Sequence, residues 1–148
     1  MSVDVQVEVN VDRPVADVAS FAGDPGNAPQ WYANITSVSW QTPPPVSVGS
    51  RKEFVAHFLG RTLTYTYEVV ELEPNRRLVM RTADGPFPME TTYTWTELDG
   101  GATRMTLRNR GTPAGFAKLT APMMERAMRR ATTKDVLRLK HLFESRGD

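Results

Sequence analysis

Alternating apolar and polar residues open the chain. Valine stands at every second position from Val3 to Val11, and acidic or amide residues fill the positions between. A period of two is typical of a β-strand that buries one face and exposes the other. We therefore predict a first strand over residues 3–11.

Two short helices are expected after this strand. Apolar residues recur at helical spacing over residues 15–22, directly after Pro14, and proline is tolerated in the first turn of a helix because its missing N–H would be unpaired there. Asp24 and Pro25 then predict a new N-terminus for a second short helix that carries Trp31.

The middle of the chain predicts six strands joined by turns. Glycine, proline, aspartate and asparagine mark most of the breaks, and Gly60-Arg61 suits a two-residue hairpin turn with glycine first. Threonines alternate with larger apolar residues, which predicts an antiparallel sheet that is dry on one face only. The strands are expected at residues 35–41, 51–59, 62–72, 76–82, 89–98 and 103–110.

From Thr112 the pattern changes to helical spacing and keeps it to the end of the chain. We predict a C-terminal helix of about 30 residues, which Pro122 either kinks or begins. The expected fold is α+β: a seven-stranded curved antiparallel sheet wrapped around this helix, with two short helices after the first strand, in one domain over residues 1–148.

This layout predicts a cavity. Seven strands make a sheet roughly 30 Å wide, whereas a helix with its side chains is only about 10–12 Å across. The helix cannot cover the dry face, so the sheet must curl and large side chains or a ligand must fill the space. The residues predicted to face inward and bind a ligand are Trp31, Trp40, Phe54, Phe58, Tyr65, Tyr67, Met80, Tyr93, Trp95, Met105, Met123, Met124 and Ala127.

Composition narrows the class of protein. The chain is 40% hydrophobic and 24% charged, near the average for soluble globular proteins, and no apolar run approaches the roughly 18 residues of a membrane-spanning helix. The N-terminus lacks the pattern of a signal peptide, so we expect a cytoplasmic protein. The net charge of +1 and the absence of a nucleic-acid motif indicate that nucleic acid is not a partner.

Little in the sequence indicates metal or cofactor chemistry. There is no cysteine, and His57 and His141 have no third ligand at a usual spacing. No nucleophile elbow, dinucleotide fingerprint or P-loop occurs, so we predict no metal, no cofactor and no assigned catalytic residue. No inward-facing Asp, Glu or His is expected beside the tyrosines.

Several segments resemble the START/Bet v 1-like (SRPBCC) superfamily, and within it the polyketide cyclase/dehydrase and lipid-transport group. The resemblance lies in residues 13–18, 24–31, 49–50, 69–78 and 100–106. It implies the helix-grip fold, and members of this group include ligand carriers, cyclases and proteins of no known activity.

Three functions stay open at this point. The first is binding or transport of a small hydrophobic molecule, lipid or polyketide-like, in the cavity. The second is a cyclase or dehydratase that uses the cavity tyrosines. The third is a protein or membrane interaction module, because residues 118–146 hold eight Lys/Arg against three Asp/Glu, including Arg126, Arg129 and Arg130. A homodimer is left open.

Overall fold

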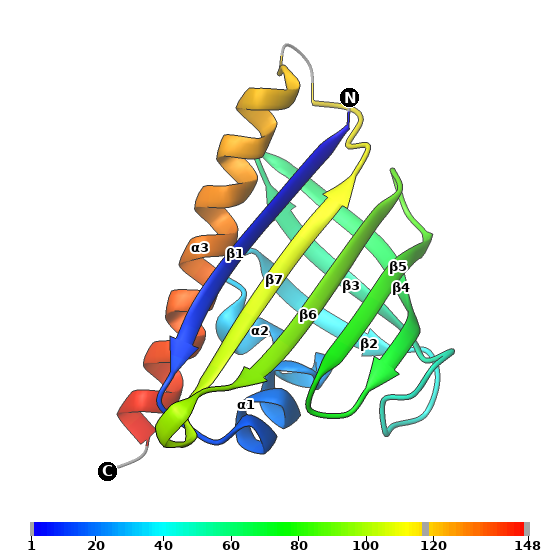
Figure 1. Ribbon diagram of the computed structural model, residues 1–148. Coiled ribbons are helices and arrows are strands. Elements are labelled where there is room, and N and C mark those ends of the chain that lie inside the picture. Colours follow the sequence, from blue (N-terminus) through cyan, green and yellow to red (C-terminus); the bar gives the residue numbers. More distant parts are fainter. Residues whose placement is uncertain (1, 117–118, 147–148) are drawn as a thin grey trace.

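Figure 1 shows the computed structural model, which describes residues 2–116 and 119–146. Seven antiparallel strands form one sheet in the order β1-β7-β6-β5-β4-β3-β2. The strands are β1 (Val3–Val11), β2 (Ile35–Trp40), β3 (Arg51–Phe58), β4 (Arg61–Glu73), β5 (Arg77–Asp84), β6 (Met89–Glu97) and β7 (Thr103–Gly111). The helices are α1 (Val15–Ala22), α2 (Ala28–Trp31) and α3 (Ala121–Arg146), with the 3₁₀ turns η1 (Pro25–Asn27) and η2 (Asp99–Gly101).

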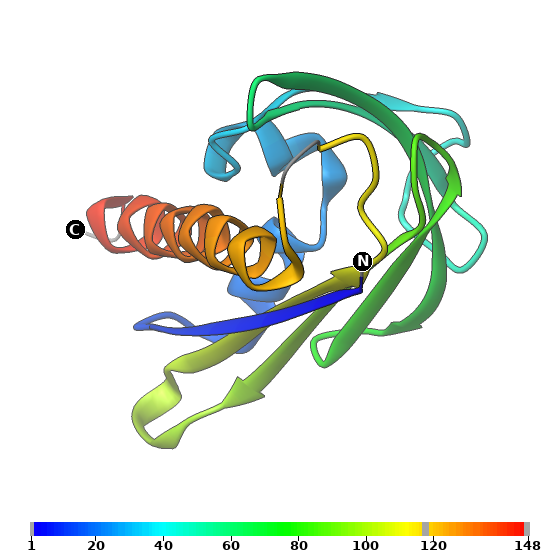
Figure 2. The same cartoon turned by 90° about the horizontal axis from the view of Figure 1, so that it is seen from above.

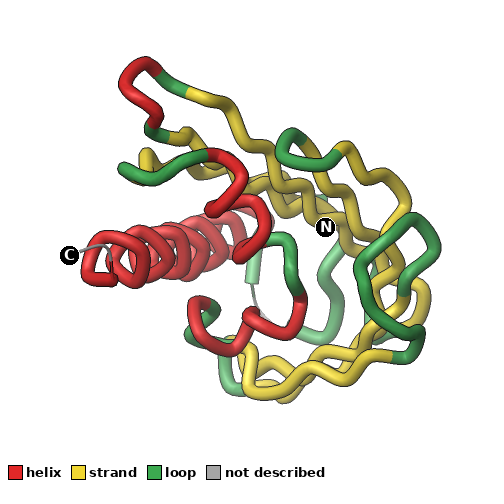
Figure 3. The backbone as a smooth tube through the Cα atoms, turned by 90° about the horizontal axis from the view of Figure 1, so that it is seen from below, coloured by secondary structure: helices red, strands yellow, loops and turns green. Residues whose placement is uncertain are grey.

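The sheet curls around α3, as Figures 2 and 3 show from above and below. Helix α3 lies along β1 at one edge of the sheet, and the strands from β7 to β2 bend away from it and around the interior. Helices α1 and α2 cover one end of the space between sheet and helix (Figure 1). The predicted helix-grip fold is confirmed.

Side chains of α3 satisfy the free backbone groups of the edge strand β1. The backbone N–H of Asp4 donates to Glu125 Oε2 (2.9 Å), and Lys140 Nζ donates to the carbonyl oxygen of Asn10 (2.7 Å). Between them, Arg129 Nη1 donates to the carbonyl oxygen of Gln6 (2.9 Å). An uncovered edge strand is a template for unwanted pairing, so these bonds both fix the helix and protect the edge.

The predicted β3–β4 turn is wrong by one residue, and of the two roles predicted for Pro122 the structure has the start of the helix. The β3–β4 turn is Leu59-Gly60 and not Gly60-Arg61, since both residues have positive φ (48° and 79°) and Phe58 pairs with Arg61. Positive φ at both central residues is the geometry that matches the twist of a hairpin. The long helix begins at Ala121, so Pro122 stands in its first turn, where proline costs no hydrogen bond.

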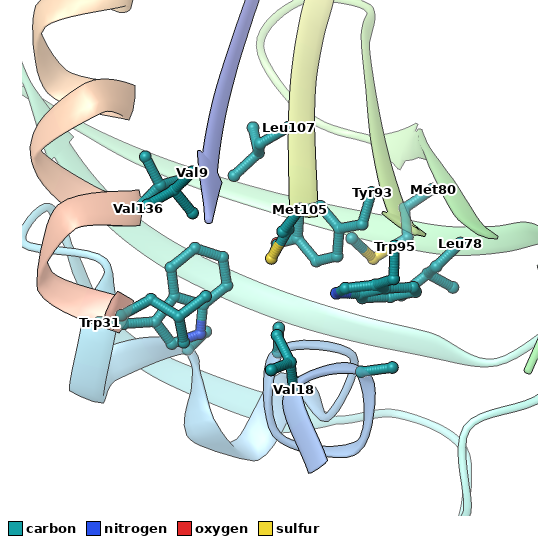
Figure 4. Packing of buried hydrophobic residues seen from close by; sticks show 14 of the residues in the cluster. Val9, Val18, Trp31, Leu78, Met80, Tyr93, Trp95, Met105, Leu107 and Val136 are labelled. Atoms are coloured by element: carbon teal, nitrogen blue, oxygen red, sulfur yellow. The ribbon is translucent and has the colours of Figure 1, made fainter. Parts of the chain in front are cut away.

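The core fills the end of the barrel near α1. Figure 4 shows Trp31 and Trp95 on either side of Val18 of α1, with Met105 and Leu107 of β7 above them. All five side chains are buried, and the Trp95 ring packs closely on Gly23 at the end of α1. The short helices therefore plug this end of the barrel with large apolar side chains.

Lys52 is a buried cation on the inner side of β3. Its side chain is completely buried, and its Nζ has no hydrogen-bond partner among the described residues. Burial lowers the pKa of Lys52 to about 8, and the carboxylate of Asp24 opposes part of that shift. An ammonium without a partner in an apolar interior is costly, so Lys52 destabilises the fold when it is charged.

Replacing Lys52→Met is expected to raise the free energy of unfolding at pH 7 by roughly 2–3 kcal/mol. Because the folded pKa lies below the ordinary value, the penalty is full below about pH 8 and fades as the pH rises toward 10.5. Urea denaturation across this range measures the difference from the wild type. The exposed Lys134→Met is the control, and a Lys52→Met protein no more stable than this control would contradict the prediction.

Candidate functional site

A cavity of about 170 Å³ lies between the inner face of the sheet and α3. Strands β3 to β6 supply the largest share of its wall. Helix α3, the short helices and the segments after α2, β5 and β7 supply most of the remainder. Most of the wall is apolar, and its polar groups are few. A concave apolar site with a few placed polar groups is the usual form of a small-molecule site.

Aromatic rings line the cavity at the end away from α1. Phe116, in the segment between β7 and α3, contacts Phe58 and Phe87 with ring centroids 5.9 and 6.0 Å away. The guanidinium of Arg61 lies 4.8 Å from the Phe116 centroid and donates to the carbonyl oxygen of Ala114 (2.7 Å). This contact holds the Phe116 ring in place at the cavity wall.

The structure brings about half of the predicted ligand-binding residues to the cavity wall. They come from four neighbouring strands and from α3, and their side chains line one cavity. The residues are Phe54, Phe58, Tyr65, Tyr67, Met80, Tyr93 and Met124.

The other predicted residues lie elsewhere. Trp31, Trp95 and Met105 belong to the core behind the cavity, and Trp40 and Ala127 are partly buried outside its wall. The inward orientation predicted for Met123 is wrong, because its side chain is 51% exposed. Successive residues of a helix point about 100° apart, so Met124 takes the inward direction and Met123 cannot.

Asp135 is the acidic group of the cavity, and the expectation of no inward acid is wrong. It lies on the inward side of α3 and is only 4% exposed. Its Oδ1 accepts a hydrogen bond from the backbone N–H of Ala33 (3.0 Å). Burial raises the pKa of Asp135 to about 6, although that hydrogen bond favours the charged form. The group can therefore gain or lose a proton near neutral pH.

Two tyrosines form a hydrogen-bonded pair near this acid. The hydroxyl oxygens of Tyr32 and Tyr93 are 2.5 Å apart, and both side chains line the cavity. Burial raises the pKa of each phenol, and the charge of Asp135 adds to the increase. Trp31 packs behind the pair, with ring centroids 4.2 Å from Tyr32 and 5.8 Å from Tyr93. The pair is therefore neutral and held in place.

A chain of hydrogen-bonded side chains crosses the cavity wall from β4 to α3. The Tyr67 hydroxyl lies 2.8 Å from Thr91 Oγ1, and Thr91 Oγ1 donates to Asn109 Oδ1 (2.6 Å). Since Thr91 has a single hydroxyl proton, Tyr67 must donate to Thr91. Asn109 Nδ2 in turn donates to Thr132 Oγ1 of α3 (3.5 Å). The Tyr67 hydroxyl can therefore accept a hydrogen bond from a ligand but cannot donate one.

Among the tyrosines of the cavity wall, Tyr65 has a hydroxyl that is available to a ligand. Its ring packs against Phe54 and Tyr67, with centroids 5.5 and 5.0 Å away, and its hydroxyl forms no hydrogen bond with another described residue. Burial is the main reason why its pKa is raised. Tyr65 can therefore donate a hydrogen bond to a ligand oxygen.

The residues missed in the sequence carried a readable signal on α3. Met128, Thr132 and Asp135 follow the predicted Met124 at steps of three and four residues, so they share its face of the helix. An acid on the inward face of a helix is unusual and could have been found by this spacing. Asn109 has the strand parity of Met105 and Leu107, so the alternation of β7 could have placed it on the inner face.

Metal chemistry finds no support in the part of the chain that the structure describes. There, no three side chains of His, Cys, Asp or Glu are grouped so that they could hold a metal ion. His57 is exposed, as its strand position predicts, and its Nδ1 lies 3.0 Å from Thr62 Oγ1. Nor does any helix in residues 2–116 and 119–146 have the length and apolar character needed to cross a membrane.

Known proteins share this architecture. Residues 2–144 match the family described as polyketide cyclase/dehydrase and lipid transport, and the sequence matches no curated protein. A START superfamily protein from Mycobacterium smegmatis superimposes with a TM-score of 0.83 at 14% identity, covering 96% of this chain and 97% of that one.

Two further solved structures are similar. An aromatase/cyclase from a Streptomyces species has a TM-score of 0.81 at 19% identity, with 100% of this chain and 97% of that chain covered. A major latex-like protein from Panax ginseng has a TM-score of 0.74 at 12% identity, with coverages of 96% and 97%. At these identities the likeness shows a shared fold.

Asp135→Asn is expected to raise the free energy of unfolding by about 2–3 kcal/mol at pH 7. Because the folded pKa of Asp135 is raised from 3.8 to about 6, the folded state binds more protons in that interval, and stability falls as the pH rises through it. The asparagine variant should lose this pH dependence while still accepting the Ala33 N–H. Denaturation at several pH values measures it, with the exposed Asp84→Asn as control. An unchanged slope in Asp135→Asn would refute the assignment.

Proposed function

Because this chain belongs to the polyketide cyclase/dehydrase and lipid transport family, we propose that it binds one small hydrophobic molecule in the cavity between the sheet and α3. The observation that carries the proposal is the distribution of polar groups. Tyr65, the Tyr32–Tyr93 pair, Asp135 and the Tyr67–Thr91–Asn109 chain lie in a wall that is mostly apolar. Within this proposal the protein acts in the cytoplasm on a small molecule and not on nucleic acid.

The size of the cavity limits the ligand. A cavity of about 150 Å³ can hold benzene, so a volume of about 170 Å³ suits a ligand of one or two rings. Four methionines in the wall can adjust to a larger guest, because their side chains are flexible and unbranched. They are Met80, Met89, Met124 and Met128.

The chemistry of the wall favours a ligand that carries oxygen. The free hydroxyl of Tyr65 can donate to a carbonyl or phenol oxygen, and the carboxyl of Asp135 can accept from a hydroxyl. Burying these groups against a pure hydrocarbon leaves them without partners, which costs free energy. The preferred guest is therefore an aromatic or alicyclic molecule with at least one hydroxyl or carbonyl group.

Binding is tested with a matched pair of probes, 2-naphthol and naphthalene, by native mass spectrometry and titration calorimetry. We expect 2-naphthol to bind about fivefold more tightly, since one hydrogen bond contributes about 1 kcal/mol. Ala131→Phe places a ring in the cavity and should weaken binding by about tenfold or more. Leu137→Phe adds a similar ring on the exposed side of the same helix and should leave binding unchanged. Equal binding by both variants would overturn the proposal.

Proton transfer is the second candidate function, and Asp135 is the observation that favours it. A carboxyl with a pKa of about 6 can act as a general base near neutral pH, beside hydroxyls that can polarise a carbonyl. The similarity to an aromatase/cyclase supports this candidate. In such a step a carbon next to the carbonyl would lose its proton to Asp135, while a tyrosine hydroxyl donates to the carbonyl oxygen.

The exchange of 2-tetralone protons with D₂O tests this candidate separately from binding. We expect the protein to accelerate the exchange at the carbons beside the carbonyl, with a rate that rises as the pH passes about 6. Asp135→Asn should abolish the acceleration, and Asp84→Asn should keep it. NMR measures the exchange. A wild-type rate equal to that of buffer, with 2-tetralone bound, would exclude this candidate and leave the binding function in place.

A further inference from the structure

A row of four exposed cations runs along the outer side of α3. Arg126, Arg130, Lys134 and Arg138 follow one another at intervals of four residues, and none of them forms an ion pair with another described residue. We call these four residues the basic row. Arg129 is not part of it, because its guanidinium is bound to the backbone of β1.

Cations on the sheet differ from the basic row. Most of the arginines on the strands are paired with a carboxylate on the same or the neighbouring strand. The pairs are Arg51–Glu68, Arg77–Glu71, Arg81–Glu90, Arg104–Glu8, Arg108–Asp4 and Arg110–Glu90. Carboxylates on the sheet therefore neutralise most of its arginines, whereas the cations of the basic row have no such partners.

Among the described residues, no carboxylate of α3 forms an ion pair with the basic row. Glu125 accepts the N–H of Asp4, Asp135 is buried in the cavity, and Glu144 pairs with Lys140 at 2.7 Å. Like charges four residues apart destabilise a helix, so three successive cation pairs are unfavourable for the isolated protein. An anionic partner would turn this unfavourable arrangement into an attractive one.

Two large apolar side chains lie among these cations. Met123 is 51% exposed and Leu137 is 54% exposed. At about 100° per residue, the basic row covers an arc of about 120°, and both apolar residues fall inside that arc. Figures 2 and 3 show α3 at the margin of the molecule, with no other element outside it. The surface is therefore both cationic and apolar along about 18 Å of straight helix.

We propose that this face of α3 binds the surface of a bilayer that contains anionic phospholipids. Phosphate groups would pair with the basic row, and Met123 and Leu137 would enter the boundary between headgroups and acyl chains. Nucleic acid offers the same negative charge, but its backbone gives the two apolar side chains no partner. A different face of the same helix lines the cavity, so docking would bring the ligand site to a membrane. The inference does not depend on which ligand the cavity holds.

Vesicle flotation with the full chain tests the proposal. The probes are phosphatidylcholine vesicles with and without phosphatidylglycerol, and we expect binding to the anionic vesicles only, with loss at high salt. One cation near such a surface contributes about fivefold in affinity, so Arg130→Gln with Lys134→Gln should weaken binding by roughly 25-fold. Arg76→Gln with Arg104→Gln removes the same charge from the sheet and should leave binding unchanged.

A second double variant, Met123→Ser with Leu137→Ser, separates lipid docking from simple charge attraction. It should weaken vesicle binding several-fold while its circular dichroism spectrum and its binding of 2-naphthol stay as in the wild type. Three results would overturn the proposal: equal binding by the helix and sheet double variants, equal binding to neutral vesicles, or binding to a DNA oligonucleotide without binding to anionic vesicles. Loss of 2-naphthol binding alone would affect the cavity proposal and not this one.

Discussion

The structure depends on one geometric constraint, the mismatch between a single helix and a seven-stranded sheet. Helix α3 is wide enough to cover only the edge near β1, where its side chains bind the backbone of that strand. The rest of the inner face can stay dry only if the strands curl round and meet other apolar groups. At one end, the large core side chains near α1 cover the inner face. The cavity occupies the remaining space.

The fold could be predicted from the sequence because strand parity is a local property. The alternating valines of β1 are buried on one side only, and each strand predicted in the meander is present. The site could be predicted only in part. Tyr65 and Tyr67 follow from parity, but the division of inward residues between core and cavity depends on where α1 and α2 pack. Asp135 lies within the apolar stripe of α3, and hydrophobic periodicity locates the apolar residues of such a stripe but not a single acid among them.

The interior contains two buried ionisable groups, which lower the stability of the fold and can take part in chemistry. Lys52 and Asp135 are both nearly or fully buried, and burial shifts the pKa of each toward its neutral form. A purely structural core would hold apolar residues at such positions. Asp135 faces the cavity, where a ligand can use it, while Lys52 lies outside the wall. Only the cost of burying Asp135 therefore arises at a position where a bound ligand can offset it.

The pairing of β1 with β7 has a consequence for how the chain folds. Val3 lies opposite Gly111, so β1 leaves the ribosome long before β7, the strand that satisfies its backbone. Such distant pairing slows folding and leaves a valine-rich segment uncovered in the meantime. Asp4, Glu8 and Asp12 interrupt that segment at every fourth position. Their charges act as gatekeepers that oppose self-association of the strand until its partner emerges.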